Sequence, residues 1–442
     1  MLFYDFSYLF IFLPITIIFF YYSKFLKIDR KIILILLSIF FYSWWNIYYL
    51  PIILFSILMN FYFFKKIISN KDNSKRNLII GIILNILLLV IFKYTDFIIQ
   101  NINLLLSTNF SYLNIPFPLA ISFFTFQSIA FLINVYDEDI INVNAKDFFL
   151  FIVFFPQLIA GPIVRYNFMT PQFNDENRAF FNKRNFIIGL TILSIGLIKK
   201  VYFADTLSQF VDFGHENINQ LNLLSSWLIS LCFTFQFYFD FSGYVDMATG
   251  SALMLNIILP QNFNSPLKAT SVIDFWQRWH ITLSNFLTNF IYYPLLRSLK
   301  QITFFNSIII TMIVFLIAGI WHGPSWNFIL FGLFHGLGLS INHIYKKYLN
   351  LNLSKYFFWF LTFNFINVSF IFFRTEKIED IIIILKKMFD IKYFFNDSLL
   401  LDELYLEFIN DLNLLFCFLL STIVCIFFKN SYVFIKTNDH EV

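Results

Sequence analysis

Histidines in an apolar sequence are the residues of this chain best suited to chemistry. His322 and His335 lie thirteen residues apart in WHGPSWNFILFGLFHGLG (321–338), and each is followed by glycine. The ordinary pKa of histidine is near neutral, so its imidazole can take up and return a proton, whereas a carboxylate in an apolar cavity tends to stay protonated. An imidazole is costly to bury, so it is retained for chemistry or for a buried hydrogen-bond partner.

The sequence between the two histidines distinguishes their roles. On one regular helix they would lie about 140° apart around the axis and roughly 20 Å apart along it. Gly323-Pro324 interrupts such a helix, so we expect His322 at the end of one helix and His335 inside the next. Irregular backbone within a membrane is tolerated mainly where it lines a cavity, which favours a chemical role for His322. For His335 we favour a structural hydrogen bond over substrate binding.

His280 is the second candidate, within DFWQRWHITLS (274–284). Two tryptophans and Arg278 precede it, and Ser284 follows one turn later, a pattern typical of an interfacial helix that lines a pocket. An interfacial histidine without a role is the alternative. The remaining histidines have polar or basic neighbours, and we expect them to be solvated: His215, His343 and His440.

Polar groups near membrane depth extend the candidate site. FYFDFSGYVDMATG (237–250) places Asp240 and Asp246 around Ser242, and carboxylates inside a membrane are functional candidates by default. An ion pair of Asp240 with Lys199 or Lys200 is equally consistent with the sequence. The full set of candidate substrate-binding residues is Trp321, Trp276, Arg278, Asp240, Asp246, Ser242 and His335.

No metal or nucleic-acid site is expected. Cys232, Cys417 and Cys425 lie in apolar runs without metal-ligand spacing, so they are predicted to be buried small hydrophobic residues. The net charge is +4, and no basic tract is long enough to indicate nucleic-acid binding.

The elements that must position these side chains are membrane helices. Hydrophobic residues make up 59% of the 442 residues and charged residues 13%, whereas about a quarter of a soluble domain is charged. Apolar runs recur along the chain and are apolar on every side, which predicts helices rather than barrel strands. We therefore predict an all-α polytopic integral membrane protein with about 10–13 transmembrane or re-entrant helices. They are expected near 7–22, 32–45, 48–64, 77–97, 117–136, 148–164, 185–203, 223–240, 244–259, 303–320, 325–345, 355–373 and 412–428.

Basic residues predict the orientation. The connections 24–31 and 65–76 are rich in Lys and Arg, whereas 98–115 has neither, so we expect the first two to be cytoplasmic and 98–115 to be an external loop. The N-terminus is then external, and the run 7–22 is a retained helix rather than a signal peptide.

The segment 260–300 differs from its surroundings. It is less apolar and contains three prolines, and its aromatic residues favour the headgroup level, so it is predicted to be an interfacial or re-entrant insertion. No linker separates domains, so residues 1–442 are expected to form a single transmembrane domain. No internal repeat is apparent, which makes the main alternative from another class, a lipid or polysaccharide exporter, less favoured.

Seven sequence blocks together resemble the membrane-bound O-acyltransferase family, in its bacterial branch of alginate and peptidoglycan O-acetylation proteins. They occur in the family's order: PLAISFFTFQSIAFLINVY (118–136), FFPQLIAGPIVR (154–165), IKKVYFAD (198–205), FYFDFSGYVDMATG (237–250), FWQRWHITLSNFLTNFIYYPL (275–295), GIWHGPSWNFILFGLFHG (319–336) and FIFFRT (370–375). Asn289 and Leu296 depart from the pattern, where an acidic residue and a glycine are common.

The resemblance implies a helical ring around a central funnel, with His322 as the catalytic histidine and His280 as a second functional residue. It implies that an acetyl group passes from a cytoplasmic donor, acetyl-CoA, across the bacterial cytoplasmic membrane to a cell-wall or secreted polysaccharide. No cofactor is expected to bind tightly. Besides membrane lipids and the polysaccharide acceptor, the expected partner is an extracytoplasmic SGNH-like acetyltransferase. Transfer of another acyl group, such as D-alanine to a teichoic acid-like polymer, is the alternative within the enzyme class.

Overall fold

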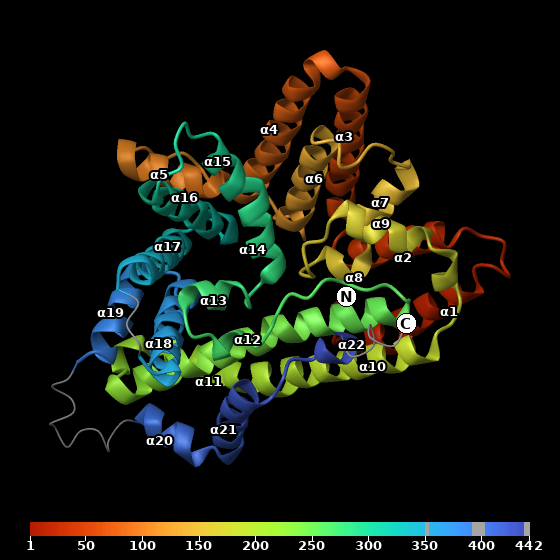
Figure 1. Ribbon diagram of the computed structural model, residues 1–442. Coiled ribbons are helices and arrows are strands. Elements are labelled where there is room, and N and C mark those ends of the chain that lie inside the picture. The colour runs from red at the N-terminus through yellow and green to blue at the C-terminus, as the bar shows by residue number, and fades with distance from the viewer. Residues whose placement is uncertain (350–352, 391–402, 437–442) are drawn as a thin grey trace. The chain divides into compact units, whose positions relative to one another are not determined.

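A computed structural model describes residues 1–349, 353–390 and 403–436 of the chain (Figure 1). All regular elements in these ranges are helices, which confirms the predicted all-α class. The chain divides into two compact units, which we describe separately. Unit 1 comprises residues 1–194 and 244–261, and unit 2 comprises residues 195–243 and 262–442.

Unit 1 is built mainly from the N-terminal helices, among which α3, α4 and α6 pack together (Figure 1). A π-helical turn, Tyr8–Phe12, leads into α1. The helices are α1 (Leu13–Tyr22), α2 (Arg30–Trp45), α3 (Leu50–Ser69), α4 (Ser74–Lys93), α5 (Thr95–Leu106), α6 (Ile121–Tyr136), α7 (Ala145–Val153), α8 (Phe155–Leu158), α9 (Tyr166–Asn174) and α10 (Lys183–Leu197), whose last residues belong to unit 2.

Unit 2 contains the remaining helices, apart from the C-terminal part of α12, which belongs to unit 1. A π-helical turn, Ile198–Ala204, follows α10. The helices are α11 (Asp205–Glu216), α12 (Leu223–Met254), α13 (Val272–Trp276), α14 (Ile281–Leu287), α15 (Tyr293–Arg297), α16 (Phe304–His322), α17 (Trp326–Tyr348), α18 (Lys355–Arg374), α19 (Ile378–Met388), α20 (Glu403–Asn410), α21 (Leu412–Phe427) and α22 (Val433–Lys436).

Six helices within the described ranges are long and apolar enough to cross a membrane, or seven if the bent pair 404–410 and 412–427 forms one span. Two shorter apolar helices, Tyr8–Tyr22 and Ile121–Tyr136, add to these. A multi-pass membrane protein is therefore confirmed, with fewer full-length spans than the larger set of apolar runs predicted. The 260–300 segment is divided into short helices.

Three predicted boundaries were wrong. Residues 244–259 do not form a separate helix, because α12 continues through Ser242-Gly243. Gly243 instead allows close packing: a Cβ atom there would lie 2.8 Å from the carbonyl oxygen of Gly196. The expected loop 98–115 begins as helix α5, which is amphipathic although it lacks basic residues.

The third wrong boundary is the single helix expected over 148–164. Helix α7 ends at Val153, and only the short α8 follows. Phe154 leaves the helical region with a ψ of 108° and is the N-cap of α8, in which Pro156 occupies a position at the helix start that proline favours. The remaining residues up to the Gly161-Pro162 pair are not helical.

Ion pairs place the two basic connections of unit 1 at the same end of that unit. Asp29, from the connection 24–31, pairs with Lys146 at 2.6 Å. Lys71, from the connection 65–76, pairs with Glu138 at 3.3 Å. Glu138 belongs to the segment that joins α6 to α7, and Lys146 lies in the first turn of α7, so the two connections share a side, as their predicted common orientation requires.

Candidate functional site

A tight hairpin of α16 and α17 positions His322 in unit 2 (Figure 1). Gly319 and Gly332 face each other across the hairpin, and a Cβ atom on either would overlap a backbone carbonyl oxygen of the opposite helix, that of Phe328 or Phe315. Small residues at such contacts let membrane helices approach closely. The hairpin therefore depends on glycine near the end that carries His322.

His322 is the last residue of α16, as predicted. Gly323 adopts an extended conformation with φ −170°, and α17 begins at Trp326. Aromatic rings surround the imidazole of His322. Its ring centroid lies 5.0 Å from Trp321, 5.2 Å from Phe373 and 5.7 Å from Phe331. The side chain is partly accessible, and packing against these rings restricts the orientation of the imidazole.

His280 combines burial with an unusual backbone conformation. It is 2% exposed and adopts a left-handed conformation with φ 43°, at the start of α14. Such a conformation is unfavourable for a residue other than glycine and is often retained at functional sites. Burial lowers the pKa of the His280 imidazole to about 3, so the ring is neutral near pH 7.

Asn262 holds the His280 ring and was not among the predicted site residues. Its Oδ1 accepts hydrogen bonds from His280 Nδ1 at 3.2 Å, from the Thr282 backbone N–H at 3.2 Å and from the Thr282 hydroxyl at 2.9 Å. In sequence Asn262 is only one of several asparagines in a polar segment. Its distance of 18 residues from His280 matches no local motif that would have identified it.

Trp321 connects the two histidines. Its ring centroid lies 5.0 Å from that of His322 and 6.4 Å from that of His280. The His280 ring also meets Phe241 edge-on at 5.0 Å. The structure therefore brings His280, Trp321 and His322, three of the predicted site residues, into one aromatic cluster.

His335 has a structural partner. Its ring is fully buried, and Trp276 Nε1 donates a hydrogen bond to His335 Nδ1 at 3.1 Å. Two further predicted residues, Trp276 and His335, thus bind each other across α13 and α17. A structural hydrogen bond of this kind is what we expected for His335, whose Nε2 is buried without a hydrogen-bond partner among the described residues.

Two of the charged candidates, Arg278 and Asp240, form ion pairs. Arg278 pairs with Asp274 at 2.7 Å. Asp240 pairs with Lys200 at 2.6 Å, and the same ammonium group contacts Asp205 at 2.9 Å. Of the two pairings open from the sequence, the structure therefore contains the one with Lys200.

The last two candidates of the 237–250 block belong to different units. Ser242 is buried within unit 2, whereas Asp246 belongs to unit 1 and is 9% exposed.

The other histidines differ partly from expectation. His215 is not in a solvated loop: it lies in α11, whose apolar face buries part of the ring. Its Nδ1 donates to the Val211 carbonyl at 2.9 Å, and Thr375 Oγ1 lies 3.3 Å from Nε2. His343 is partly buried on α17, and His440 is outside the described residues. Among the residues that the structure describes, no group of three or more His, Cys, Asp or Glu could hold a metal ion.

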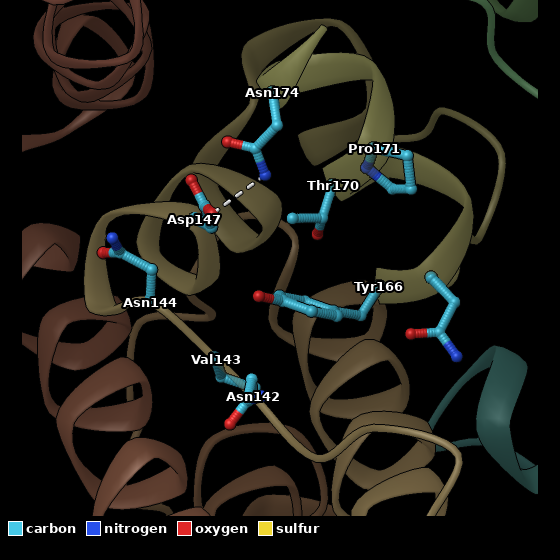
Figure 2. Close-up of a pocket in the computed structure, with 9 residues that line it drawn as sticks. Asn142, Val143, Asn144, Asp147, Tyr166, Thr170, Pro171 and Asn174 are labelled. Atoms are coloured by element: carbon cyan, nitrogen blue, oxygen red, sulfur yellow. Dashed lines mark hydrogen bonds between the residues drawn. The ribbon is translucent and has the colours of Figure 1, made fainter.

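Unit 1 contains a separate polar cavity of about 680 Å³ (Figure 2). The buried carboxylate of Asp147 lines this cavity. It pairs with Lys31 at 2.7 Å and accepts a hydrogen bond from Asn174 at 3.1 Å. Tyr166 and Thr170 also line it (Figure 2). None of the predicted site residues does. Burial raises the pKa of Tyr166 to about 12, so its hydroxyl is neutral.

The residues of the histidine cluster lie in a part of the chain that matches a known protein family. The model of the membrane-bound O-acyltransferase family matches residues 39–375. The chain belongs to the membrane-bound O-acyltransferase family. That match includes His280, Trp321 and His322, and also Asn262.

Three relatives indicate the branch of the family. The chain is 45% identical over 340 residues to a peptidoglycan O-acetyltransferase of Helicobacter pylori, covering 70% of this chain and 64% of the relative. It is 34% identical over 314 residues to a probable alginate O-acetylase AlgI of Azotobacter vinelandii, covering 70% and 61%. It is 26% identical over 284 residues to a teichoic acid D-alanyltransferase of Streptococcus thermophilus, covering 58% and 68%. The chain thus matches less than two thirds of the length of the first two.

Proposed function

We propose that this protein is a membrane O-acetyltransferase that takes an acetyl group from a cytoplasmic thioester and passes it outward for O-acetylation of a cell-wall or secreted polysaccharide. The observation that carries the proposal is the joint contact of His280 and His322 with Trp321 in a chain of this family. The higher identity to a peptidoglycan O-acetyltransferase and an alginate O-acetylase than to a D-alanyltransferase supports acetyl as the group.

The chemistry needs a base and a means of holding the reacting groups. In transfer from a thioester, an acceptor hydroxyl oxygen bonds to the carbonyl carbon, the carbon–sulfur bond breaks, and the hydroxyl proton passes to the leaving thiolate. The partly accessible His322 is assigned the proton transfer. The neutral, buried His280 is assigned a contact that orients a substrate or stabilises developing charge. A covalent acyl-histidine intermediate is a second route for His322.

The proposal includes the membrane setting. We assign acetyl-CoA as donor, the bacterial cytoplasmic membrane as location, and an external N-terminus. An extracytoplasmic SGNH-like acetyltransferase is proposed to complete delivery to the polysaccharide. The shared side of the two basic connections in unit 1 supports the orientation, since clusters of Lys and Arg mark cytoplasmic connections.

The test is to delete the gene in its host and restore it, then measure what mild base releases from purified cell-wall and secreted polysaccharide. We expect acetate to fall on deletion and to return on restoration. Membranes from the restored cells should transfer label from acetyl-CoA to the same polymer. Acetate that is unchanged in both polymers on deletion would refute the proposal.

Transfer of D-alanine is the second candidate function, because a D-alanyltransferase is among the relatives. The same base hydrolysate distinguishes it. A loss of D-alanine with unchanged acetate would assign the D-alanyl function.

A further inference from the structure

The orientation of the Asn262 amide is determined by its neighbours. The Thr282 backbone N–H can only donate, so the Asn262 side-chain atom 3.2 Å from it must be the oxygen. His280 Nδ1 lies 3.2 Å from the same oxygen. Because an amide oxygen only accepts hydrogen bonds, His280 Nδ1 must carry the proton.

This proton position defines the other ring nitrogen. A neutral imidazole with a proton on Nδ1 has a lone pair on Nε2. His280 Nε2 is buried and has no hydrogen-bond partner among the residues that the structure describes. The Asn262 Nδ2 donor is likewise buried without a partner in those ranges. Among the described residues, His280 Nε2 is therefore an unused hydrogen-bond acceptor, and Asn262 Nδ2 is an unused donor.

We propose that Asn262 is a positioning residue that fixes His280 as the Nδ1-protonated tautomer, so that Nε2 accepts a hydrogen bond from a hydroxyl or thiol of the substrate. The left-handed backbone of His280 and the three hydrogen bonds to Asn262 Oδ1 hold this arrangement. The ring neighbours Phe241 and Trp321 do not titrate near neutral pH, so Asn262 is the polar group that selects the tautomer. The inference rests on the proposed function.

The test compares acetyl transfer from acetyl-CoA to polymer in membranes with matched amounts of folded variant. Asn262→Ala should lower transfer about 10- to 100-fold, the usual effect of losing a group that orients an imidazole. Combined with His280→Ala, it should add little further loss, because it acts through that ring. If the fold-losses of activity in the two single variants multiply in the double variant, the proposal is overturned.

Asn262→Asp keeps an acceptor for His280 Nδ1 and for Thr282, so this variant should fold even if the alanine variant does not. Its carboxylate should stabilise the imidazolium and raise the pKa of His280, so transfer should decline on the acid side at a higher pH than in the parent. An unchanged pH profile with parental activity would contradict the assignment.

Asn367→Ala is the matched control. Asn367 is a fully buried asparagine of unit 2, and its side chain accepts a hydrogen bond from Thr234 at 2.7 Å between α18 and α12. It should lower the melting temperature while leaving the pH profile unchanged. Inactivity of the parent itself would refute the proposed function, whereas an active parent with an equally active Asn262→Ala variant would refute only the role of Asn262.

Discussion

At the residue scale, the two site histidines have different surroundings that suit different tasks. His280 is buried and hydrogen-bonded in one tautomer, whereas His322 lies at a helix end and is partly accessible. A protein interior retains a strained, buried imidazole only when surrounding interactions offset its cost. The chain therefore holds one histidine rigidly and leaves the other partly accessible.

Replacing His280 and His343 one at a time should distinguish a histidine of the site from one outside it. His280→Ala should lower polymer acetylation by about two orders of magnitude at unchanged membrane levels, as expected for loss of a group that orients or stabilises the reacting atoms. His343→Ala should remain near the parent, because His343 lies two turns beyond His335 on α17, outside the histidine cluster. The assay is base-released acetate, and the opposite ranking would place the site elsewhere.

The sequence predicted His322 and His280 because each stands out locally: one adjoins a Gly-Pro break and the other lies among tryptophans. Asn262 was missed because its role depends on a contact that only folding creates. Likewise, the sequence left Asp240 open between a functional role and an ion pair with Lys199 or Lys200, and the fold pairs it with Lys200. Local chemistry identifies candidate residues, whereas partners from distant parts of the chain become visible only in the fold.

At the element scale, the α16–α17 hairpin is the part of the fold on which His322 depends. Gly319→Ala should separate the helices, because its Cβ atom would overlap the Phe328 carbonyl oxygen. Overpacking of this kind costs about 1–3 kcal/mol. We expect a lower melting temperature in detergent and reduced acetylation per folded protein.

Gly81→Ala in unit 1 is the control for Gly319→Ala. A Cβ atom at Gly81 would approach the end of the flexible Leu132 side chain, which can move, rather than backbone. Its effect should therefore be small. Parental melting and activity of Gly319→Ala would show that the hairpin does not need the close approach.

The helices themselves were largely predictable, since long apolar runs in a membrane protein leave few alternatives. The boundary predicted near residue 243 failed because a small residue has two interpretations. Gly243 suggested a break, yet it lies within α12 at a close contact with Gly196. A sequence alone does not reveal whether a glycine in an apolar run ends a helix or lies within it and allows a neighbouring helix to pack closely.

At the scale of the whole molecule, the distribution of charge predicts how the chain crosses the membrane. Single cysteines at Ser74 and Ser107 should differ in labelling by an impermeant reagent added to intact cells, with only the second labelled. The native Cys232, Cys417 and Cys425 are buried, so their background should be low. Labelling of both sites before cell lysis would contradict the orientation.

The central claim is that His322 performs the chemistry of acetyl transfer, and His322→Gln tests it most directly. Glutamine retains hydrogen-bonding capacity but cannot act as a base near neutral pH or carry an acyl group at a useful rate. We predict that the variant inserts and melts like the parent while base-released acetate on the polysaccharide falls by about two to four orders of magnitude. Substantial acetylation by the glutamine variant at a matched membrane level would contradict the claim and assign His322 a structural role.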